Sequence, residues 1–305
     1  MSSRPSHAML LIALLAGTAT AQDAVEAPTE TKQSPLSVAL TLSGSHAGKA
    51  DFDDATGSLS ITRLGAALGI GYKLSDKASL QIGMSAEHSH YDFSSSTNLI
   101  AGTSEPFDDI LIARFSAGLD FAIDDSRSWF VNGFITSSGE SGADFDDTIT
   151  GGGMVGYVHT FNEKLTLGVG VIGSSRLEDD FLVFPVPIIR WQVAEKLVLA
   201  TGQGASVSLT YQPSQTWAVG VEGGWERREF RLDKDGPVPS GIALDSRIPL
   251  GVFARFTPNQ NFIIGGRVGA HLGSNLEISN AQGRKIVEDD LDPAIYFGLD
   301  LTVRF

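Results

Sequence analysis

The sequence ends with Ile295-Tyr-Phe-Gly-Leu-Asp-Leu-Thr-Val-Arg-Phe305, and every odd-numbered position of this stretch is apolar. The even-numbered positions carry small, polar or amphipathic residues. An apolar residue at every second position is typical of a β-strand with one face in an apolar environment and the other in water. About 11 residues is also the length that a tilted strand needs to cross a bilayer core. The stretch is therefore predicted to close a transmembrane β-barrel, although a soluble β-sandwich can show the same alternation.

The first residues predict export from the cytoplasm. Arg4 and His7 precede the apolar run 8–16, and Ala19-Thr-Ala21 offers the small residues of a cleavage site. A basic start, a short apolar core and an A-x-A site are typical of a secretory signal peptide, here residues 1–21. Residues 22–35 lack periodicity and large apolar groups, and we expect a flexible periplasmic tail.

Composition narrows the class of the exported chain. It has no cysteine, which excludes disulfides and thiolate metal sites, and after the signal no stretch approaches 18 uninterrupted apolar residues. Without Arg4, 21 Lys and Arg residues remain against 36 Asp and Glu, a formal charge of 21 − 36 = −15. This balance argues against a nucleic-acid partner, because binding to phosphates needs a basic surface.

Residues 36–305 are predicted to form one all-β, antiparallel, up-and-down barrel of about 14 strands. The connections alternate between short turns and longer, mostly acidic loops such as 94–108, 232–242 and 273–290, a pattern that places the short turns in the periplasm. The short pair 196–201 and 205–212 is the weakest assignment, so 12 strands is the alternative. The predicted strands cover 36–42, 64–74, 80–93, 111–123, 129–135, a glycine-rich segment up to Phe161, 165–171, 182–193, 196–201, 205–212, 216–230, 246–256, 262–272 and 295–305.

Aromatic residues support a membrane barrel. They cluster beside the short turns and at the chain end, where amphipathic rings favour the membrane interface. The residues of this predicted girdle are Tyr72, Phe121, Trp129, Phe161, Trp191, Tyr211, Trp217, Phe256, Phe262 and Phe305.

Two resemblances point to the bacterial outer membrane. The terminal Phe305 resembles the C-terminal signature of Gram-negative outer-membrane barrels, which implies the outer-membrane assembly machinery as a partner. The segments Phe184-Pro-Val-Pro-Ile-Ile-Arg-Trp191, 197–202, 207–211 and 217–232 resemble a family of bacterial outer-membrane barrels known only as a domain of unknown function. That second resemblance covers about fifty residues; it implies a barrel and supplies no activity.

Charged residues from distant strands share the parity that faces the barrel lumen. One interpretation is a porin-like channel for small solutes whose lining sets selectivity. The alternative is a closed structural or adhesive barrel whose lumen is filled by salt bridges, since buried charges must be paired. The predicted lumen residues are Lys73, Arg114, Asp120, Arg190, Glu222, Glu226, Arg255, Arg267, Asp300 and Arg304.

A lipid hydrolase is the least favoured function. His88-Ser-His90 beside Glu87 offers a nucleophile and a base. Adjacent strand positions diverge, however, so that His88 faces lipid while Ser89 and Glu87 face the lumen, beyond the hydrogen-bond reach that catalysis requires. We therefore predict no enzyme activity.

A repeated acidic pair occurs where the outside connections return to the membrane. Five of seven carry it, and a ring of carboxylates would concentrate cations at the mouth of a pore. The ring could also hold loosely bound calcium or magnesium, bridging to lipopolysaccharide phosphates; no other cofactor is predicted. Solvated loop residues are the simpler interpretation. The candidate rim consists of Asp53, Asp54, Asp108, Asp109, Asp146, Asp147, Asp179, Asp180, Asp289 and Asp290. The sequence does not predict the solute or the oligomeric state.

Overall fold

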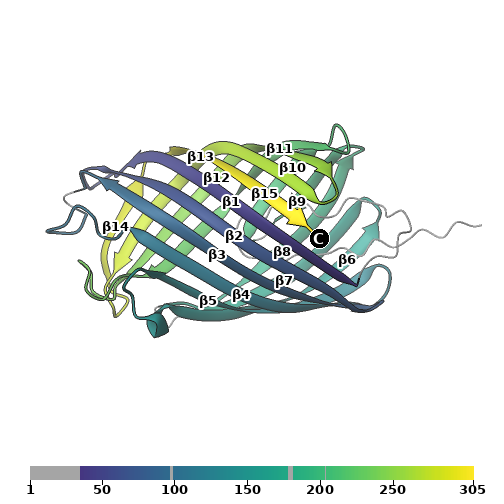
Figure 1. The fold of residues 1–305 in the computed structure, drawn as a ribbon, viewed down its shortest axis with the longest axis horizontal. Helices are drawn as coiled ribbons and strands as arrows, with labels where there is room; N and C mark the ends of the chain where they lie inside the picture. Colours follow the sequence, from purple (N-terminus) through teal and green to yellow (C-terminus); the bar gives the residue numbers. More distant parts are fainter. Residues whose placement is uncertain (1–34, 97–98, 178–180, 203) are drawn as a thin grey trace, which may run out of the picture.

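A computed structural model describes residues 35–96, 99–177, 181–202 and 204–305. These residues form one closed antiparallel sheet, which confirms the predicted 14-strand barrel (Figure 1). The strands are β1 (Leu36–Asp51), β2 (Ser58–Ser75), β3 (Ala78–Ser94), β4 (Asp109–Ala122), β5 (Arg127–Glu140), β6 (Ile149–Asn162), β7 (Leu165–Ser175), β8 (Phe181–Ala194), β9 (Leu197–Thr201), β10 (Ala205–Tyr211), β11 (Trp217–Arg231), β12 (Ile242–Asn259), β13 (Phe262–Ser279), β14 (Lys285–Leu291) and β15 (Ala294–Arg304).

The fifteen strands form a fourteen-stranded barrel because β14 and β15 share one position in the wall. Both pair with β13, one after the other along its length. Residues 262–271 of β13 pair with β15, and residues 274–279 pair with β14. The barrel closes where β1 pairs with β15, from Ala39 opposite Arg304 to Ala47 opposite Tyr296. The terminal stretch is thus the closing strand, as its alternation predicted.

The two ends of the barrel differ in the length of their connections. Short turns link β2 to β3, β4 to β5, β6 to β7, β8 to β9, β10 to β11 and β12 to β13. By the rule for outer-membrane barrels we call this the periplasmic end and the opposite one the extracellular end. The segments predicted as signal peptide and tail, 1–21 and 22–35, lie outside the described residues except for Pro35.

Several strands run further toward the extracellular end than their alternation predicted. The predicted loop 273–290 is a hairpin, because β13 continues to Ser279 and β14 returns from Lys285. The short strands β9 and β10 are present, so the barrel has 14 strands and not 12. One short 3₁₀ helix, η1 (Phe145–Thr148), lies in the connection from β5 to β6. None of the helices within the described residues has the length and apolar character to cross a membrane.

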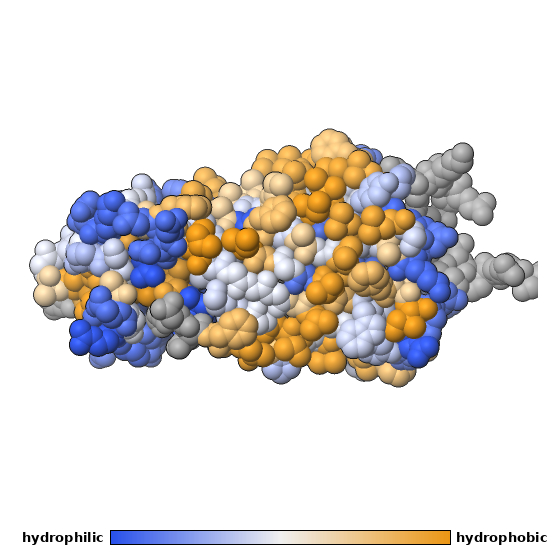
Figure 2. All heavy atoms as spheres, turned by 90° about the horizontal axis from the view of Figure 1, so that it is seen from below, coloured by the Kyte–Doolittle hydropathy of each residue, from blue (hydrophilic) through white to orange (hydrophobic). Residues whose placement is uncertain are grey.

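The outside of the membrane section is apolar. Figure 2 shows apolar residues over the body of the barrel and hydrophilic residues gathered at the extracellular end, on the left. Nine of the ten predicted girdle residues are exposed; the exception, Phe256, is half-buried with its ring centroid 4.9 Å from that of Trp217. The girdle therefore lies on the outer surface, as predicted.

The inside of the extracellular section is a packed hydrophobic core. The rings of Tyr91, Phe107 and Phe230 contact one another with centroids 5.1–5.5 Å apart. Such close packing of apolar side chains is typical of the interior of a soluble protein. We call this group the extracellular core; its buried members are Ala50, Phe52, Leu59, Ile61, Tyr91, Phe93, Leu99, Ile100, Phe107, Ile110, Phe230, Leu232, Val238, Ala243, Leu276, Ile278, Leu291 and Ala294.

The barrel narrows at this level. Arg231 at the end of β11 pairs with Gly139 at the end of β5, so these two strands meet above the tops of β6 to β10. Arg231 also donates hydrogen bonds to the carbonyls of Asp147, Leu177 and Ser240 at 3.0–3.1 Å. One buried guanidinium therefore ties three connections together over the shorter strands.

Candidate functional site

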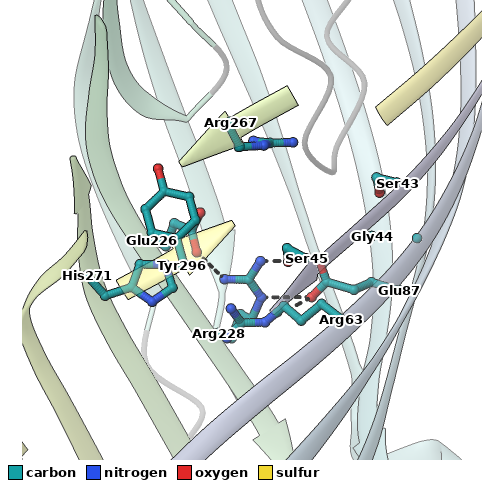
Figure 3. Close-up of a pocket in the computed structure, with 11 residues that line it drawn as sticks. Ser43, Gly44, Ser45, Arg63, Glu87, Glu226, Arg228, Arg267, His271 and Tyr296 are labelled. Carbon is teal, nitrogen blue, oxygen red and sulfur yellow. Dashed lines mark hydrogen bonds and ion pairs between the residues drawn. The ribbon is translucent and has the colours of Figure 1, made fainter. Parts of the chain in front are cut away.

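Directly beneath the extracellular core lies a layer of buried and half-buried charges, which we call the ion network. It consists of three arginines and three carboxylates: Arg63, Arg228, Arg247, Glu87, Glu226 and Asp245. All six point inward from β2, β3, β11 and β12, and four of them line a small pocket (Figure 3). The formal charges cancel, as charges removed from water require.

Arg228 lies at the centre of one half of the ion network. Its Nε and Nη2 donate to the two carboxylate oxygens of Glu87 at 2.8 and 3.2 Å, and its Nη1 donates to Glu226 at 2.7 Å. Figure 3 shows this guanidinium held between the two carboxylates. Two charge-assisted contacts to one carboxylate fix the orientation of the side chain as well as its charge.

Asp245 organises the other half. It accepts hydrogen bonds from Arg63 Nη2 at 2.8 Å, from Arg247 Nε at 2.6 Å and from the Tyr91 hydroxyl at 2.9 Å. Tyr91 thus belongs to the extracellular core through its ring and to the ion network through its hydroxyl. His271 lies beside Arg247, and its ring stacks on Tyr296 with centroids 4.5 Å apart.

The ten predicted lumen residues do not form one lining. Glu226 belongs to the ion network, while Arg267 lies 3.9 Å from Glu222 and 3.7 Å from Asp300 in a second, looser group. Lys73 pairs instead with Asp76 in the periplasmic turn. Two arginines lie over aromatic rings: the guanidinium carbon of Arg114 is 3.7 Å from the centroid of the Phe134 ring, and that of Arg255 is 4.7 Å from the centroid of the Phe253 ring. Asp120 accepts a hydrogen bond from the Ser79 hydroxyl. Arg190 and Arg304 are half-buried on β8 and β15.

Most of the ion network was missed by the sequence interpretation. Arg63 lies two residues before Gly65, and Arg228 lies two residues after Glu226. Since alternate residues of a strand face the same side, both arginines can be identified as inward-facing from the sequence. Arg63 directly precedes the predicted strand 64–74, whereas Arg228 lies inside the predicted strand 216–230 without being named as a lumen residue.

Side chains occupy much of the space above the lumen glycines. A side chain at Gly156 would overlap the Phe130 ring, and one at Gly170 would overlap the end of Met154. Phe130, Met154 and Val158 form a second, smaller apolar cluster with Ile172, Val186 and Ile188. The lumen beside β5 to β8 therefore contains an apolar cluster, whereas the ion network lies beside β2, β3, β11 and β12.

The His-Ser-His segment diverges as the strand parity predicted. Ser89 is fully buried and donates to Glu87 inside the barrel. His88 and His90 lie on the outer side, within 3.4 and 2.8 Å of an Asp109 carboxylate oxygen. The serine is thus separated by the barrel wall from both histidines.

Two of the five acidic pairs are brought together. The side chain of Asp289 accepts the backbone N–H groups of Asp54 and Ala55, and the Asp53 N–H donates to the Asp290 carbonyl. Asp109 contacts the two histidines, Asp108 donates its N–H to Glu140, and Asp146 and Asp147 lie in η1. Asp179 and Asp180 lie outside the described residues. In the described part of the chain no group of three or more potential ligands is arranged to hold a metal ion, and cation binding at the rim stays a prediction.

Several solved structures of outer-membrane proteins are similar to this one. The structure is similar to the COG4313 outer membrane channel from Pseudomonas putida F1, with a TM-score of 0.49, 12% identity, and coverage of 91% of this chain and 99% of that one. It is also similar to the P. putida toluene transporter TodX, with a TM-score of 0.45, 10% identity, and coverage of 89% and 90%. A Pseudomonas aeruginosa FadL homologue gives a TM-score of 0.37 and 11% identity over 89% and 90%.

No curated protein sequence matches the chain. A family model matches residues 53–304, nearly the whole barrel, which confirms the family resemblance found in residues 184–232. The chain belongs to the family described as Domain of unknown function (DUF6268).

Proposed function

We propose that this protein is a bacterial outer-membrane channel that is closed to ions along its axis. The observation that carries the proposal is the pair of stacked barriers at the extracellular end. The extracellular core excludes water, and the ion network beneath it has its charges paired with one another. A hydrated ion entering from outside would have to displace both, at the cost of exposing buried apolar surface and separating buried charges.

This proposal differs from an open, cation-favouring porin. An acidic rim raises the local concentration of cations, but it sets selectivity only where a water-filled path continues beneath it. The closed interior supports a channel that admits its solute by another route or only after rearrangement. We also propose that the signal peptide exports the protein, that Phe305 directs its assembly and that the barrel contacts lipopolysaccharide.

Recordings in planar lipid bilayers test the closed axis. We expect the folded wild-type protein to give no sustained conductance steps. The variant Phe107→Ala/Phe230→Ala removes two of the three rings at the centre of the extracellular core, and we expect it to leak in bursts. Phe115→Ala is the matched control, because Phe115 is exposed on the outer surface of β4. A difference in gel migration between unheated and heated samples would verify that each variant is folded. Steady steps from the wild type would overturn the proposal.

A closed structural barrel that carries no solute is the second candidate. The balanced charges of the ion network favour it, because such a lattice stiffens a barrel without serving transport.

A further inference from the structure

The outer wall of the barrel carries a row of polar side chains across β1 to β4, which lie side by side (Figure 1). His46, Thr62, His90 and Asp109 are directly opposite one another on these four neighbouring strands. Thr62 and His90 are exposed, and His46 and Asp109 are half-buried. We call these four residues and the exposed His88, two positions before His90, the polar patch.

The polar patch borders the apolar band of the barrel. His88 lies directly between Leu64 on β2 and Leu111 on β4, and both of these side chains are exposed on the outer wall. On the other side, His46 lies opposite the exposed Phe297 of β15, with ring centroids 5.6 Å apart. Polar groups that face lipid are costly, and they usually mark a site where a partner binds. The partner of the polar patch therefore lies at the surface of the outer leaflet.

One end of the polar patch is negatively charged and accepts hydrogen bonds. Asp109 Oδ1 lies 2.8 Å from His90 Nδ1 and 3.4 Å from His88 Nε2. Because a carboxylate only accepts, a neutral His90 donates from Nδ1 and keeps Nε2 as an acceptor. Among the residues that the structure describes, these two histidines are the only ion-pair partners of Asp109, and its side chain is 43% exposed. This end therefore fits a cation that has N–H groups to donate.

The other end offers a hydrogen-bond donor whichever tautomer His46 adopts. His46 Nδ1 and Thr62 Oγ1 are 2.9 Å apart. If the hydroxyl donates to the ring, the proton on His46 Nε2 is left over; if the ring donates to the hydroxyl, the hydroxyl proton is left over. One donor therefore remains for an anionic group. The two ends meet at Thr62 and His90, which lie on adjacent strands about 4.8 Å apart.

We propose that the polar patch binds the zwitterionic phosphoethanolamine headgroup of a phospholipid. The ammonium group binds to Asp109 and His90, and the phosphate accepts the remaining donor of the His46–Thr62 pair. Only a two-carbon linker separates the two charges of this headgroup, which fits ends that meet on adjacent strands. The inference goes beyond the proposed channel, because the polar patch lies on the outer wall and its ligand is the same whether or not the axis conducts.

Native mass spectrometry of the folded barrel in detergent tests the headgroup. The protein is mixed with equal amounts of phosphatidylethanolamine and phosphatidylglycerol that have the same acyl chains. We expect the wild type to retain roughly tenfold more phosphatidylethanolamine, the difference that one charge-assisted hydrogen bond makes. His90→Leu/Asp109→Leu extends the apolar wall and should abolish this preference. Asp109→Asn keeps the shape of the side chain and should abolish it as well, so it serves if the double variant does not fold.

His159 provides the matched control. It lies on β6 at the periplasmic end, where its ring contacts that of the exposed Phe161 with centroids 4.3 Å apart. His159→Leu removes an imidazole at the opposite end of the barrel and should leave the preference for phosphatidylethanolamine unchanged.

Four results would overturn the proposal. The first is equal retention of the two lipids by the wild type, and the second is a preference that survives in both Asp109 variants. The third is equal retention of phosphatidylcholine and phosphatidylethanolamine, because the choline ammonium group has no N–H to donate. The fourth is a preference that disappears when EDTA is added, which would mean that a metal ion on the histidines and Asp109 bridges to the phosphate.

Discussion

The extracellular section and the membrane section of the same strands place their apolar side chains on opposite faces. On β2, Leu59 and Ile61 are buried inside the barrel, whereas Leu64 and Tyr72 are exposed on its outer surface. On β3, Tyr91 and Phe93 point inward, and Met84 is exposed outside. The parity of the apolar residues therefore changes along both strands, and Arg63 and Glu87 lie at the change.

The difference follows from the solvent on each side of the wall. Apolar side chains leave water wherever they can, and in the membrane section the lipid outside provides that environment. Above the membrane the outside is water, so the same residue types turn inward and pack on one another. One chain thus combines a membrane barrel with an extracellular interior that is packed like that of a soluble protein.

The largest expected effect comes from truncating the extracellular core. Phe230→Ala removes a fully buried ring that contacts Tyr91 and Phe107. We expect a loss of about 3–5 kcal/mol in the stability of the extracellular section, the usual range for a buried aromatic. Limited proteolysis of the extracellular connections in the folded barrel measures this loss.

Phe115→Ala on the lipid-facing surface serves as the control and should leave those cleavage sites protected. Equal proteolysis of the two variants would mean that the extracellular section is not an independent packed core.

A smaller effect is expected in the ion network. Asp245→Asn leaves Arg63 and Arg247 without their shared carboxylate, and breaking a buried ion pair costs about 3–5 kcal/mol. We expect the lower part of this range, because the amide oxygen still accepts one hydrogen bond. Urea unfolding followed by tryptophan fluorescence measures the change. Asp92→Asn on the exposed face of β3 is the control, and a similar loss in both variants would contradict a special role for the ion network.

The smallest effect concerns the acidic residues beyond the strand ends. Desolvation, followed by the neighbouring carboxylates of Asp292 and Asp290, raises the pKa of Asp53. A raised folded-state pKa means that the folded protein binds this proton more tightly than the unfolded chain, so stability falls as the pH rises above the ordinary value of 3.8. Asp53→Asn should therefore melt slightly higher than the wild type at pH 7, and the difference should vanish well below that ordinary value. A difference that persists at acidic pH would contradict this electrostatic origin.

The membrane section could be predicted from the sequence because its signals are local. Alternation in residues 295–305 and the girdle residues beside the short turns depend only on neighbours along the chain. The extracellular core could not be predicted in this way. Its residues come from loops and strand ends far apart in the sequence, such as Phe107 and Phe230, and each looks like an isolated aromatic until the topology joins them.

The site was predicted in part for the same reason. Parity identified Glu222, Arg267 and Asp300 as lumen residues, and they do lie together. The ion pairs could not be predicted, because partners such as Arg63 and Asp245 are separated by 182 residues in the sequence. They meet only because the barrel closes. The glycine-rich strand β6 gave no parity of its own; the structure fixes it through Met154 and Val158, which point inward.

Pro185 and Pro187 lie where β8 pairs with β7 alone, at odd-numbered positions like Ile189, whose N–H points away from β7 to Thr201. They bear on how copies of this chain meet. A strand edge with free N–H groups is a template on which a second chain can add a strand, which leads to edge-to-edge association. Along residues 181–188 that edge lacks two donors in a row of alternate positions, so a continuous ladder with a neighbouring barrel cannot form there. The edge of β8 is thus kept from becoming a site at which neighbouring barrels join in a crowded membrane.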